Sequence, residues 1–548
     1  MKTKKLLLGD EAFALGAIRA GLSGAYAYPG TPSTEILEFV QTDPEARRRG
    51  IHSHWSSNEK TAVEEALGMS FCGKRAIAAM KHVGVNVAAD PFVNSAMTGA
   101  NGGMIVVAAD DPSMHSSQNE QDSRFYADFA MLPALEPSSQ QEAYDMAAYG
   151  FDLSERLGLP VMFRIVTRLA HSRGVVETDE ENRPENELRY PANPSQWVLM
   201  PGNSRRRYAE LVSRRPEVLA ESEKSPFNRY IPGGNHSLGI IASGIAYNYV
   251  MEAYPAGCPF TIVKISQYPL PLETIGRLFD QCETVLVVEE GQPVIEQSLR
   301  GALDSNPKVR GKLDGYLPRT GELTPDSVRS ALGTLAPDTV APLPPVPEPH
   351  PLVAPRPPAL CQGCSHRDVY AALNAALEEY DSPKVFGDIG CYTLGWLAPF
   401  NAIDTTVDMG ASITMAKGAA DAGQHPAVAV IGDSTFTHSG MTGLLDAINE
   451  DSPITVIISD NLTTGMTGGQ DSQGTGKIEQ ICIGLGADPA HVRTIDTLPR
   501  KVEEMKELFR EEFDHKGLSV VVARRECIQT ARRHAAKKPS NPSKASTR

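Results

Sequence analysis

Apolar and polar positions along the chain follow two alternating periods. In the first 200 residues, segments with a helical repeat, such as 9–21 and 58–73, alternate with short continuous apolar runs such as GGMIVVAADDP at 102–112. This alternation is typical of a parallel sheet whose buried strands are covered by helices on both faces. Residues 237–335 and 361–530 repeat it. We therefore predict an α/β fold built from parallel sheets in three blocks.

The segments between these blocks have a different composition. Residues 180–236 are polar and rich in Arg and Pro, which predicts a loop-rich connection, and the dense prolines of 336–360 predict an extended linker. Beyond residue 530 the chain is basic without periodicity, so we expect a disordered tail. The expected organisation is a first domain at 1–200, a connection at 201–236, a middle domain at 237–335, a linker at 336–360, a third domain at 361–530 and a tail at 531–548.

Composition excludes several classes of function. There are 52 Lys and Arg against 67 Asp and Glu, a net charge of −15, which disfavours general nucleic-acid binding. No apolar run reaches the roughly 18 residues that span a membrane, and the leucines before Gly9 are too few for a signal peptide. We expect a soluble, cytoplasmic protein. Its eight cysteines contain no Cys-x-x-Cys-x-x-Cys-x-x-x-Cys run, so no ferredoxin-type cluster domain is expected within these residues.

The segment AVAVIGDSTFTHSGMTGLLDAINEDSPITVIISDNLTTG, residues 427–465, is the most informative for chemistry. Asp433 ends one apolar run and Asn461 ends the next, with room for one helix and one strand between them, so we expect both at neighbouring strand ends. These oxygen donors, with a backbone carbonyl such as that of Thr463, suit Mg²⁺ bound to a diphosphate. A helix beginning at Asp433 would offer its N–H groups to the same anion. The alternative is a turn with a helix cap.

This segment is similar to the thiamine diphosphate motif, in which Gly-Asp-Gly is followed one helix and one strand later by Asn-Asn. Ser434 and Asp460 are the departures from that pattern. The resemblance implies that Asp433, Asn461 and the carbonyl of Thr463 hold the metal.

Thiamine diphosphate also needs a carboxyl group bonded to its aminopyrimidine ring, supplied by a different domain. Glu59 in HWSSNEKTAVEEALGMS is the candidate, because Ser56, Ser57 or Asn58 can cap a helix whose first turn contains it. The alternative interpretation is a carboxylate that stabilises the helix N-terminus.

A wider resemblance covers about residues 6–525 in one order, interrupted mainly at 180–236. The chain resembles the 2-oxoacid:ferredoxin oxidoreductases, and among them the α subunits of the indolepyruvate type. The motifs that carry this resemblance are 28–35, 58–60, 80–84, 86–91, 109–112, 116–122, 361–367, 387–395, 409–412 and 467–470.

The resemblance implies a thiamine diphosphate-binding fold, with a pyrimidine domain, a transketolase C-terminal-like middle domain and a diphosphate domain. It implies a thiamine diphosphate- and Mg²⁺-dependent oxidative decarboxylation of an arylpyruvate, of the indolepyruvate or phenylpyruvate type, with coenzyme A. The products are an aryl-acetyl-CoA, CO₂ and two electrons. Glu59 would activate the cofactor, Thr31 would contact the substrate carboxylate, and His82 would lie near the reaction centre. The remaining cofactor-binding candidates are Cys361, Cys364, His366, Asp388, Gly390, Cys391, Met409, Gly410, Ala411, Gly432, Asp433, Ser434, Asn461, Thr463, Gly465 and Met466.

Two features of these candidates bear on substrate and metal. An apolar Met466 would suit an aromatic substrate, although a Met in a core needs no such explanation. The pair Cys361 and Cys364 invites a metal interpretation, but zinc needs two more N or S ligands, and only His366 is close in sequence. We therefore favour a pocket-lining or buried role for the cysteines.

The electrons need a carrier, and we expect an iron–sulfur cluster or flavin on a partner. The resemblance implies a β subunit, an α2β2 assembly, and ferredoxin or another electron acceptor. The first alternative is a non-oxidative thiamine diphosphate-dependent decarboxylase or carboligase. The second is a non-catalytic scaffold subunit, which would not need to retain Glu59, Asp433 and Asn461.

Overall fold

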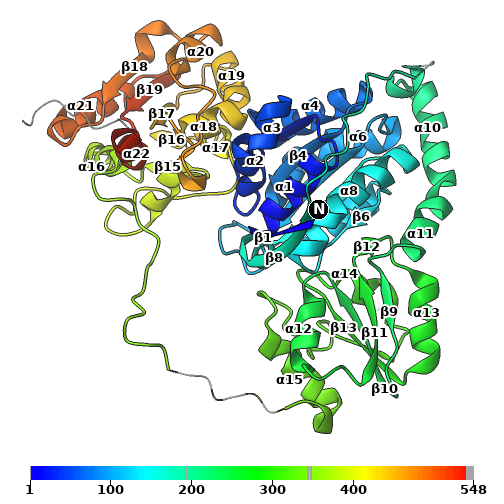
Figure 1. Cartoon of the computed structure of the whole chain (residues 1–548). Helices are drawn as coiled ribbons and strands as arrows, with labels where there is room; N and C mark the ends of the chain where they lie inside the picture. The colour runs from blue at the N-terminus through cyan, green and yellow to red at the C-terminus, as the bar shows by residue number, and fades with distance from the viewer. Residues whose placement is uncertain (1, 192–193, 342, 344, 346–347, 538–548) are drawn as a thin grey trace, which may run out of the picture. The chain divides into compact units, whose positions relative to one another are not determined.

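The computed structural model describes residues 2–191, 194–341, 343, 345 and 348–537, and its internal contacts divide the chain into two compact units, 1–347 and 348–548 (Figure 1). Both units are α/β with largely parallel sheets, which confirms the predicted fold class. The division falls inside the proline-rich stretch, where the described residues between 340 and 360 contain neither helix nor strand, although 337–339 form one 3₁₀ turn.

The main sheet of the first unit has the strand order β12–β6–β7–β5–β4–β2–β3, and all pairs are parallel except β12 with β6. Helix α1 packs against α8, and α4 packs against α6. The strands are β2 (Gly24–Ala27), β3 (His52–Trp55), β4 (Ala76–Lys81), β5 (Met104–Asp110), β6 (Ala134–Leu135), β7 (Val161–Val166) and β12 (Gln267–Tyr268). The helices are α1 (Gly9–Arg19), α2 (Thr34–Thr42), α3 (Pro44–Arg49), α4 (Glu59–Phe71), α5 (His82–Val87), α6 (Ala89–Thr98), α7 (Arg124–Phe129), α8 (Gln140–Leu157) and α9 (Thr167–His171).

A second sheet of this unit has the order β14–β13–β10–β11–β9, with β9 antiparallel and the other pairs parallel. Figure 1 shows it between α12 and α15 on one side and α13 on the other. A separate antiparallel pair joins β1 (Lys2–Leu8) to β8 (Arg173–Asp179). The remaining elements are β9 (Arg229–Ile231), β10 (Asn235–Ser243), β11 (Phe260–Ile265), β13 (Thr284–Val288), β14 (Val309–Arg310), α12 (Ala246–Ala253), α13 (Leu272–Gln281), α14 (Val294–Arg300) and α15 (Pro325–Leu335).

Arg164 is the centre of a buried ionic network in the first unit. Its side chain is fully buried in β7 and donates to Asp110 at 2.6 Å and to Glu136, with Asp122 at 3.4 Å. A charge taken out of water is tolerated only when partners of opposite sign surround it, and three carboxylates do so here.

Arg124 extends this network to the second sheet. It donates to Asp122 at 2.6 Å and to Glu289, which directly follows β13, at 2.8 Å. The two guanidinium groups hold the pKa of the buried Asp122 carboxyl well below its usual range, against the effect of burial. The buried acid–base pairs therefore fasten the two sheets together.

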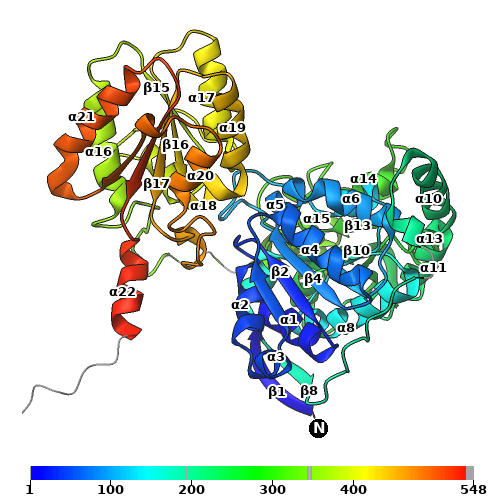
Figure 2. The ribbon, with the colours of Figure 1, turned by 90° about the horizontal axis from the view of Figure 1, so that it is seen from above.

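The second unit has one five-stranded parallel sheet in the order β15–β16–β17–β19–β18. Figure 2 shows α16 and α21 along one face and α17 and α19 along the other, and each face has its own apolar core. The strands are β15 (Lys384–Gly387), β16 (Ala427–Gly432), β17 (Thr455–Asp460), β18 (Val492–Asp496) and β19 (Ser519–Arg524). The helices are α16 (Ser365–Leu377), α17 (Ala411–Asp421), α18 (Asp433–Thr435), α19 (Met441–Asn449), α20 (Ile478–Gly484), α21 (Val502–Phe513) and α22 (Ile528–Lys537).

The described residues of 180–200 contain no α-helix or strand, as a loop-rich connection predicts. The prediction was wrong for 201–223, because α10 (Pro201–Ser213) and α11 (Arg215–Glu223) lie there. Their prolines occupy the first helical turn, where the missing N–H costs nothing. Surface pairs such as Arg207 with Glu210 support α10 with little apolar surface.

The predicted disordered tail was also partly wrong. Residues 531–537 belong to α22, and the backbone amide of Ala531 donates to the carbonyl of Cys527 at 2.9 Å as the helix begins. Residues 538–548 lie outside the described residues. Among the helices of the described part, none has the length and apolar character needed to cross a membrane.

We predict that Arg164→Met lowers the free energy of unfolding of the first unit by about 3–5 kcal/mol, because it leaves buried carboxylates without their counter-ion. Denaturant unfolding of the full chain measures the change. The matched control is Arg183→Met, since Arg183 pairs with Asp152 at 2.7 Å on the surface and should matter by about 0–1 kcal/mol. Equal losses in the two variants would contradict the assigned role of the network.

Candidate functional site

The predicted metal ligands of the second unit follow two neighbouring strands. β16 and β17 pair in parallel with Gly432 opposite Ser459, so Asp433 and Asn461 leave the sheet at the same edge. This confirms the predicted adjacency of the two strand ends. The helical segment from 433 to 449 starts at Asp433 and places a helix N-terminus at this edge.

Asp433 is a buried carboxylate without a full set of partners. It is 2% exposed, and the backbone amides of Ser434 and Asn461 donate to it, but its Oδ2 has no hydrogen-bond partner. Burial and the neighbouring Asp460 raise the pKa of Asp433 to about 7. A cation would remove this penalty, because an orphaned carboxylate oxygen is the kind of donor a hard cation binds. The residues present therefore fit a metal ion.

The chain after Asn461 forms a tight turn with the oxygen donors on it. Asn461 Oδ1 accepts from the backbone amide of Thr463 at 3.2 Å, and Thr463 Oγ1 donates to the carbonyl of Gln470 at 2.9 Å. Ser434 Oγ and Thr464 Oγ1 are 2.8 Å apart, which ties this turn to the end of β16.

His366 lies beneath this turn. It is 1% exposed, its Nε2 is 3.5 Å from Asn461 Nδ2, and its Nδ1 has no partner. Burial and the Arg525 cation lower the pKa of His366 to about 4. His366 is therefore a neutral group of the interior around physiological pH.

Several of the predicted cofactor-binding residues pack around Tyr392. A Cβ on Gly390 or Gly432 would lie 2.3 Å or 2.7 Å from the Tyr392 ring, so both positions need glycine for packing. The Tyr392 hydroxyl donates to Asp388, whose other oxygen accepts from the backbone amide of Gly410 at 3.1 Å. Asp388 thus orients the N-terminus of α17 with its side chain.

Of the remaining predicted residues, Met409 and Ala411 flank Gly410 and are partly exposed. Gly465 and Met466 follow the 461–464 turn, and the Met466 side chain is 58% exposed. An apolar side chain this exposed is available for contact with a ligand or another surface.

Four cysteines gather at one end of the second unit. Burial and the nearby thiols of Cys361, Cys364 and Cys527 raise the pKa of Cys391 to about 12. The Cys391 sulfur also lies 3.2 Å from where a Cβ on Gly465 would be. Sequence reasoning missed Cys527, which is 136 residues from Cys391 in the chain.

Hydrogen bonds connect the segments that contain these cysteines. The amide of Cys527 donates to the carbonyl of Asn461 at 3.0 Å, and Gln529 Nε2 donates to Cys361 Sγ at 3.5 Å. Arg525 donates to the carbonyl of Gly363 at 3.2 Å. The loop 361–364 is therefore fixed against the 525–529 segment.

The distances between the cysteine sulfurs bear on whether these residues could form a zinc site. A tetrahedral zinc with Zn–S bonds of about 2.3 Å draws its sulfurs to within about 4 Å of one another. Among the described residues, no three cysteine sulfurs lie within 4.8 Å of one another. Within the part of the chain that the structure describes, the cysteine group therefore lacks the close spacing of a tetrahedral zinc site.

Glu59 of the first unit is the first residue of α4, as the capping pattern predicts. Asn58 is the cap, and its Oδ1 accepts from the backbone amide of Thr61 at 2.9 Å. The Glu59 side chain is 5% exposed and lies against Gly84, where a Cβ would be 2.6 Å from Glu59 Oε1. The absence of a side chain at Gly84 therefore makes room for the carboxylate.

Thr31 lies in a turn that other motifs hold in place. Its carbonyl accepts from Ser116 Oγ at 3.2 Å, and Lys81 Nζ donates to Ser116 Oγ at 3.0 Å. Burial lowers the pKa of Lys81 to about 8 although Asp111 is near. Sequence reasoning did not single out Lys81, whose position at the end of an apolar run was the available signal.

His82 anchors the loop that follows β5. The backbone amide of Asp111 donates to its Nδ1 at 3.2 Å, and its Nε2 is 3.2 Å from the carbonyl of Asn119. These partners fit a neutral imidazole with its proton on Nε2. The motifs at 28–35, 80–84 and 109–122 are therefore brought together in three dimensions.

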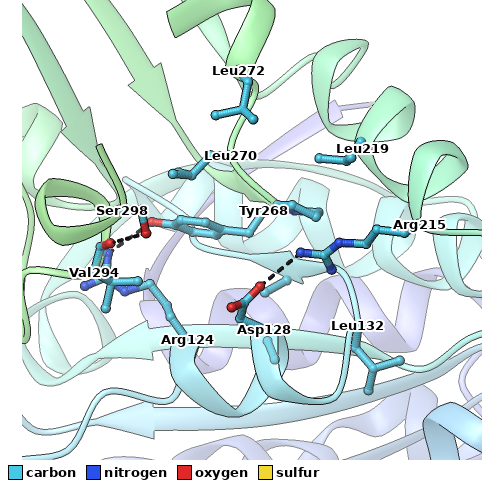
Figure 3. A pocket seen from close by; sticks show the side chains of 13 residues that line it. Arg124, Asp128, Leu132, Arg215, Leu219, Tyr268, Leu270, Leu272, Val294 and Ser298 are labelled. Atoms are coloured by element: carbon cyan, nitrogen blue, oxygen red, sulfur yellow. Dashed lines mark hydrogen bonds and ion pairs between the residues drawn. The ribbon is translucent and has the colours of Figure 1, made fainter. Parts of the chain in front are cut away.

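The first unit also contains a pocket of 280 Å³ between α7, α11 and the start of α14 (Figure 3). Four leucine side chains and Tyr268 are among the residues that line it, and Arg215 and Asp128, which also line it, form an ion pair at 3.0 Å. None of the predicted site residues lines it.

Comparison with known proteins assigns the chain to a family. Residues 15–225 match the thiamine diphosphate-binding domain of pyruvate flavodoxin/ferredoxin oxidoreductases, and residues 388–523 match the C-terminal thiamine pyrophosphate-binding domain of thiamine pyrophosphate enzymes. The indolepyruvate oxidoreductase subunit IorA of Archaeoglobus fulgidus is 40% identical over 96% of this chain and 86% of its own length. The chain belongs to the IorA family.

Other relatives agree with this assignment. IorA of Methanothermobacter thermautotrophicus is 38% identical over 96% of this chain and 87% of its own length, and IorA of Pyrococcus abyssi is 39% identical over 95% and 85%. A solved structure, the 2-oxoglutarate:ferredoxin oxidoreductase of Magnetococcus marinus, is similar with a TM-score of 0.50 and 18% identity, over 61% of this chain and 65% of that one. That likeness concerns the fold alone. As a member of the IorA family, the protein is a 2-oxoacid oxidoreductase subunit with thiamine diphosphate-binding domains.

We predict that Asp433→Asn stabilises the chain in the absence of metal and cofactor at pH 8. The folded carboxyl has a pKa of about 7, above its unfolded value, so ionisation costs stability as the pH rises through that range. Each pKa unit is worth about 1.4 kcal/mol, or about 3–6 °C in Tm for a domain of this size. Thermal unfolding should show a gain at pH 8 that shrinks at pH 5. The exposed Asp446→Asn is the control, and a destabilised Asp433→Asn at pH 8 would contradict the assignment.

Proposed function

We propose that the protein oxidatively decarboxylates an arylpyruvate of the indolepyruvate or phenylpyruvate type and transfers the acyl group to coenzyme A. The observation that carries this proposal is the match to indolepyruvate oxidoreductase subunits over nearly the whole chain. The products would be an aryl-acetyl-CoA, CO₂ and two electrons. The exposed, apolar Met466 next to the proposed cofactor-binding turn supports an aromatic substrate.

Three residues of the second unit are proposed to hold Mg²⁺ and, through it, the diphosphate. They are Asp433, Asn461 and the carbonyl of Thr463. The orphaned Oδ2 of Asp433 and the helix N-terminus beside it support this role, because both favour a cation–diphosphate pair. When bound, thiamine diphosphate supplies the carbanion chemistry that a 2-oxoacid decarboxylation needs.

Three residues of the first unit are proposed to act on the cofactor and the substrate. Glu59, buried against Gly84, would hold a proton at the aminopyrimidine ring. Thr31 would contact the substrate carboxylate from a turn fixed by Ser116. Because both nitrogens of His82 are already engaged, we propose that His82 positions the loop beside the reaction centre.

We also propose that the first electron carrier is a [4Fe–4S] cluster held by Cys361, Cys364, Cys391 and Cys527. This differs from the expectation that every cluster or flavin resides on a partner. The nearness of four cysteines to one another and the position of Cys391 beside Gly465 support it, because electrons would then travel a short way from the proposed diphosphate site.

The relatives are subunits by name, which supports a partner subunit for this chain. We propose a β subunit in an α2β2 assembly, with ferredoxin or another carrier as the final acceptor. A non-oxidative decarboxylase or carboligase is the second candidate, and the four gathered cysteines disfavour it. A scaffold role is disfavoured by the presence of Glu59, Asp433 and Asn461 with buried, site-like surroundings.

We predict that Glu59→Gln retains thiamine diphosphate but loses at least about 10²-fold in turnover, because the amide cannot take part in proton transfer. The assay uses the full complex with indolepyruvate or phenylpyruvate, with and without coenzyme A and an artificial electron acceptor. Glu64→Gln is the matched control, since Glu64 lies exposed on the same helix and pairs with Lys60.

Near-normal turnover of Glu59→Gln would remove Glu59 from its proposed role. Release of an aldehyde by the unaltered complex, with no reduction of the acceptor, would favour the non-oxidative candidate instead.

We predict that the chain purified without oxygen contains about four iron and four acid-labile sulfide atoms, the content of one [4Fe–4S] cluster. Cys391→Ser and Cys527→Ser should lose both. Cys258→Ser, a free cysteine of the first unit, should keep them. An iron-free chain after cluster reconstitution would contradict this proposal and indicate that the electron carrier resides on a partner subunit.

A further inference from the structure

Three helix ends of the first unit bring together metal-binding side chains that have no role in the function proposed above. Asp10 lies in the first turn of α1, Glu35 in the first turn of α2, and His171 at the end of α9. One ligand atom from each lies within 4.8 Å of the others. A single ion with bonds of about 2.0–2.2 Å to N and O ligands could contact all three after small adjustments.

The Asp10 carboxylate is the strongest sign that something is bound there. The residue is 0% exposed, and neither of its oxygens has a hydrogen-bond partner. Among the described residues no salt bridge reaches Asp10, in contrast to the buried carboxylates around Arg164. A buried carboxylate in this state must either take a proton or bind a cation.

The side chains of Glu35 and His171 are partly exposed to solvent. Glu35 Oε2 lies 3.4 Å from His171 Nε2, and their side chains are 35% and 33% exposed. Asp10 is therefore buried next to two part-exposed side chains. The backbones of α1 and α9 approach closely here, since a Cβ on Gly9 would lie 2.3 Å from the carbonyl oxygen of Leu169.

We propose that Asp10, Glu35 and His171 bind a divalent transition-metal ion of the zinc class. One imidazole with two carboxylates is a donor set that suits such ions, whereas Mg²⁺ and Ca²⁺ prefer oxygen ligands alone. Three protein ligands leave a fourth coordination position for water on the side of the part-exposed Glu35 and His171.

The site would have a structural consequence for the proposed substrate turn. α2 begins three residues after Thr31, and Gly30, Ser33 and Thr34 are hydrogen-bonded within that turn. An ion shared by α1, α2 and α9 would fix the start of α2 and, with it, the end of the turn. We therefore assign the ion a structural role.

The test is a Co²⁺ titration of the full chain saturated with Mg²⁺ and thiamine diphosphate. Co²⁺ bound by N and O donors lacks the intense near-ultraviolet band of thiolate coordination, so the cysteine group is counted separately. The unaltered chain should bind one more Co²⁺ equivalent of the N/O type than Asp10→Asn or His171→Gln. The melting temperature should rise with Zn²⁺ in the unaltered chain and in neither variant.

His115→Gln is the matched control. His115 pairs with Glu322 at the same distance of 3.4 Å but belongs to no three-ligand group among the described residues, so this variant should bind like the unaltered chain. His171 is part-exposed, so His171→Gln tests the proposal even if Asp10→Asn fails to fold. Equal Co²⁺ stoichiometry in all folded variants would overturn the proposal and leave Asp10 as a buried, protonated acid.

Discussion

The parallel pairing of β16 with β17 is the constraint on which the cofactor end of the protein depends. Parallel strands end at the same edge, so the register that places Gly432 opposite Ser459 also brings Asp433 next to the turn at Asn461. The same edge starts the helix at 433 and receives the Cys527 amide on the Asn461 carbonyl. One pair of strands thus positions the proposed metal donors, the helix N-terminus and the segment that contains Cys527.

Buried acidic residues in this protein fall into two groups, which differ in whether a guanidinium group pairs with the carboxylate. Asp110, Asp122 and Glu136 face guanidinium groups from the same chain, which neutralise them in the folded state. Asp433 and Asp10 are also buried, but among the described residues no salt bridge pairs either of them with a cationic side chain, and both have oxygens without hydrogen-bond partners. Burying these carboxylates in the charged form costs folding free energy, and either a proton or a cation from outside the chain would reduce that cost.

Several motif residues of the second unit have packing roles within the chain. Gly390 and Gly432 leave room for the ring of Tyr392, and Asp388 uses its carboxylate on Tyr392 and on the start of α17. This packing orients the edge of the sheet at which the cofactor-binding residues are proposed. A motif therefore includes residues that shape a site as well as residues that react in it, and only the contacts in the structure distinguish the two.

The sequence by itself determined the features that depend on near neighbours. Apolar periodicity predicted the parallel sheets, and the Asn58 cap placed Glu59 in the first turn of α4, because such signals act within one or two turns of chain. The sequence did not reveal the two helices within 201–236, because prolines that begin a helix are hard to distinguish from loop prolines.

The tertiary structure alone decided which distant side chains meet. Cys527 joins Cys391 across 136 residues, Lys81 holds the turn of Thr31 through Ser116, and Asp10 meets His171 across 161 residues. Strand order and helix packing set these encounters, and neither is written in any local pattern, because each depends on contacts distributed over the whole fold.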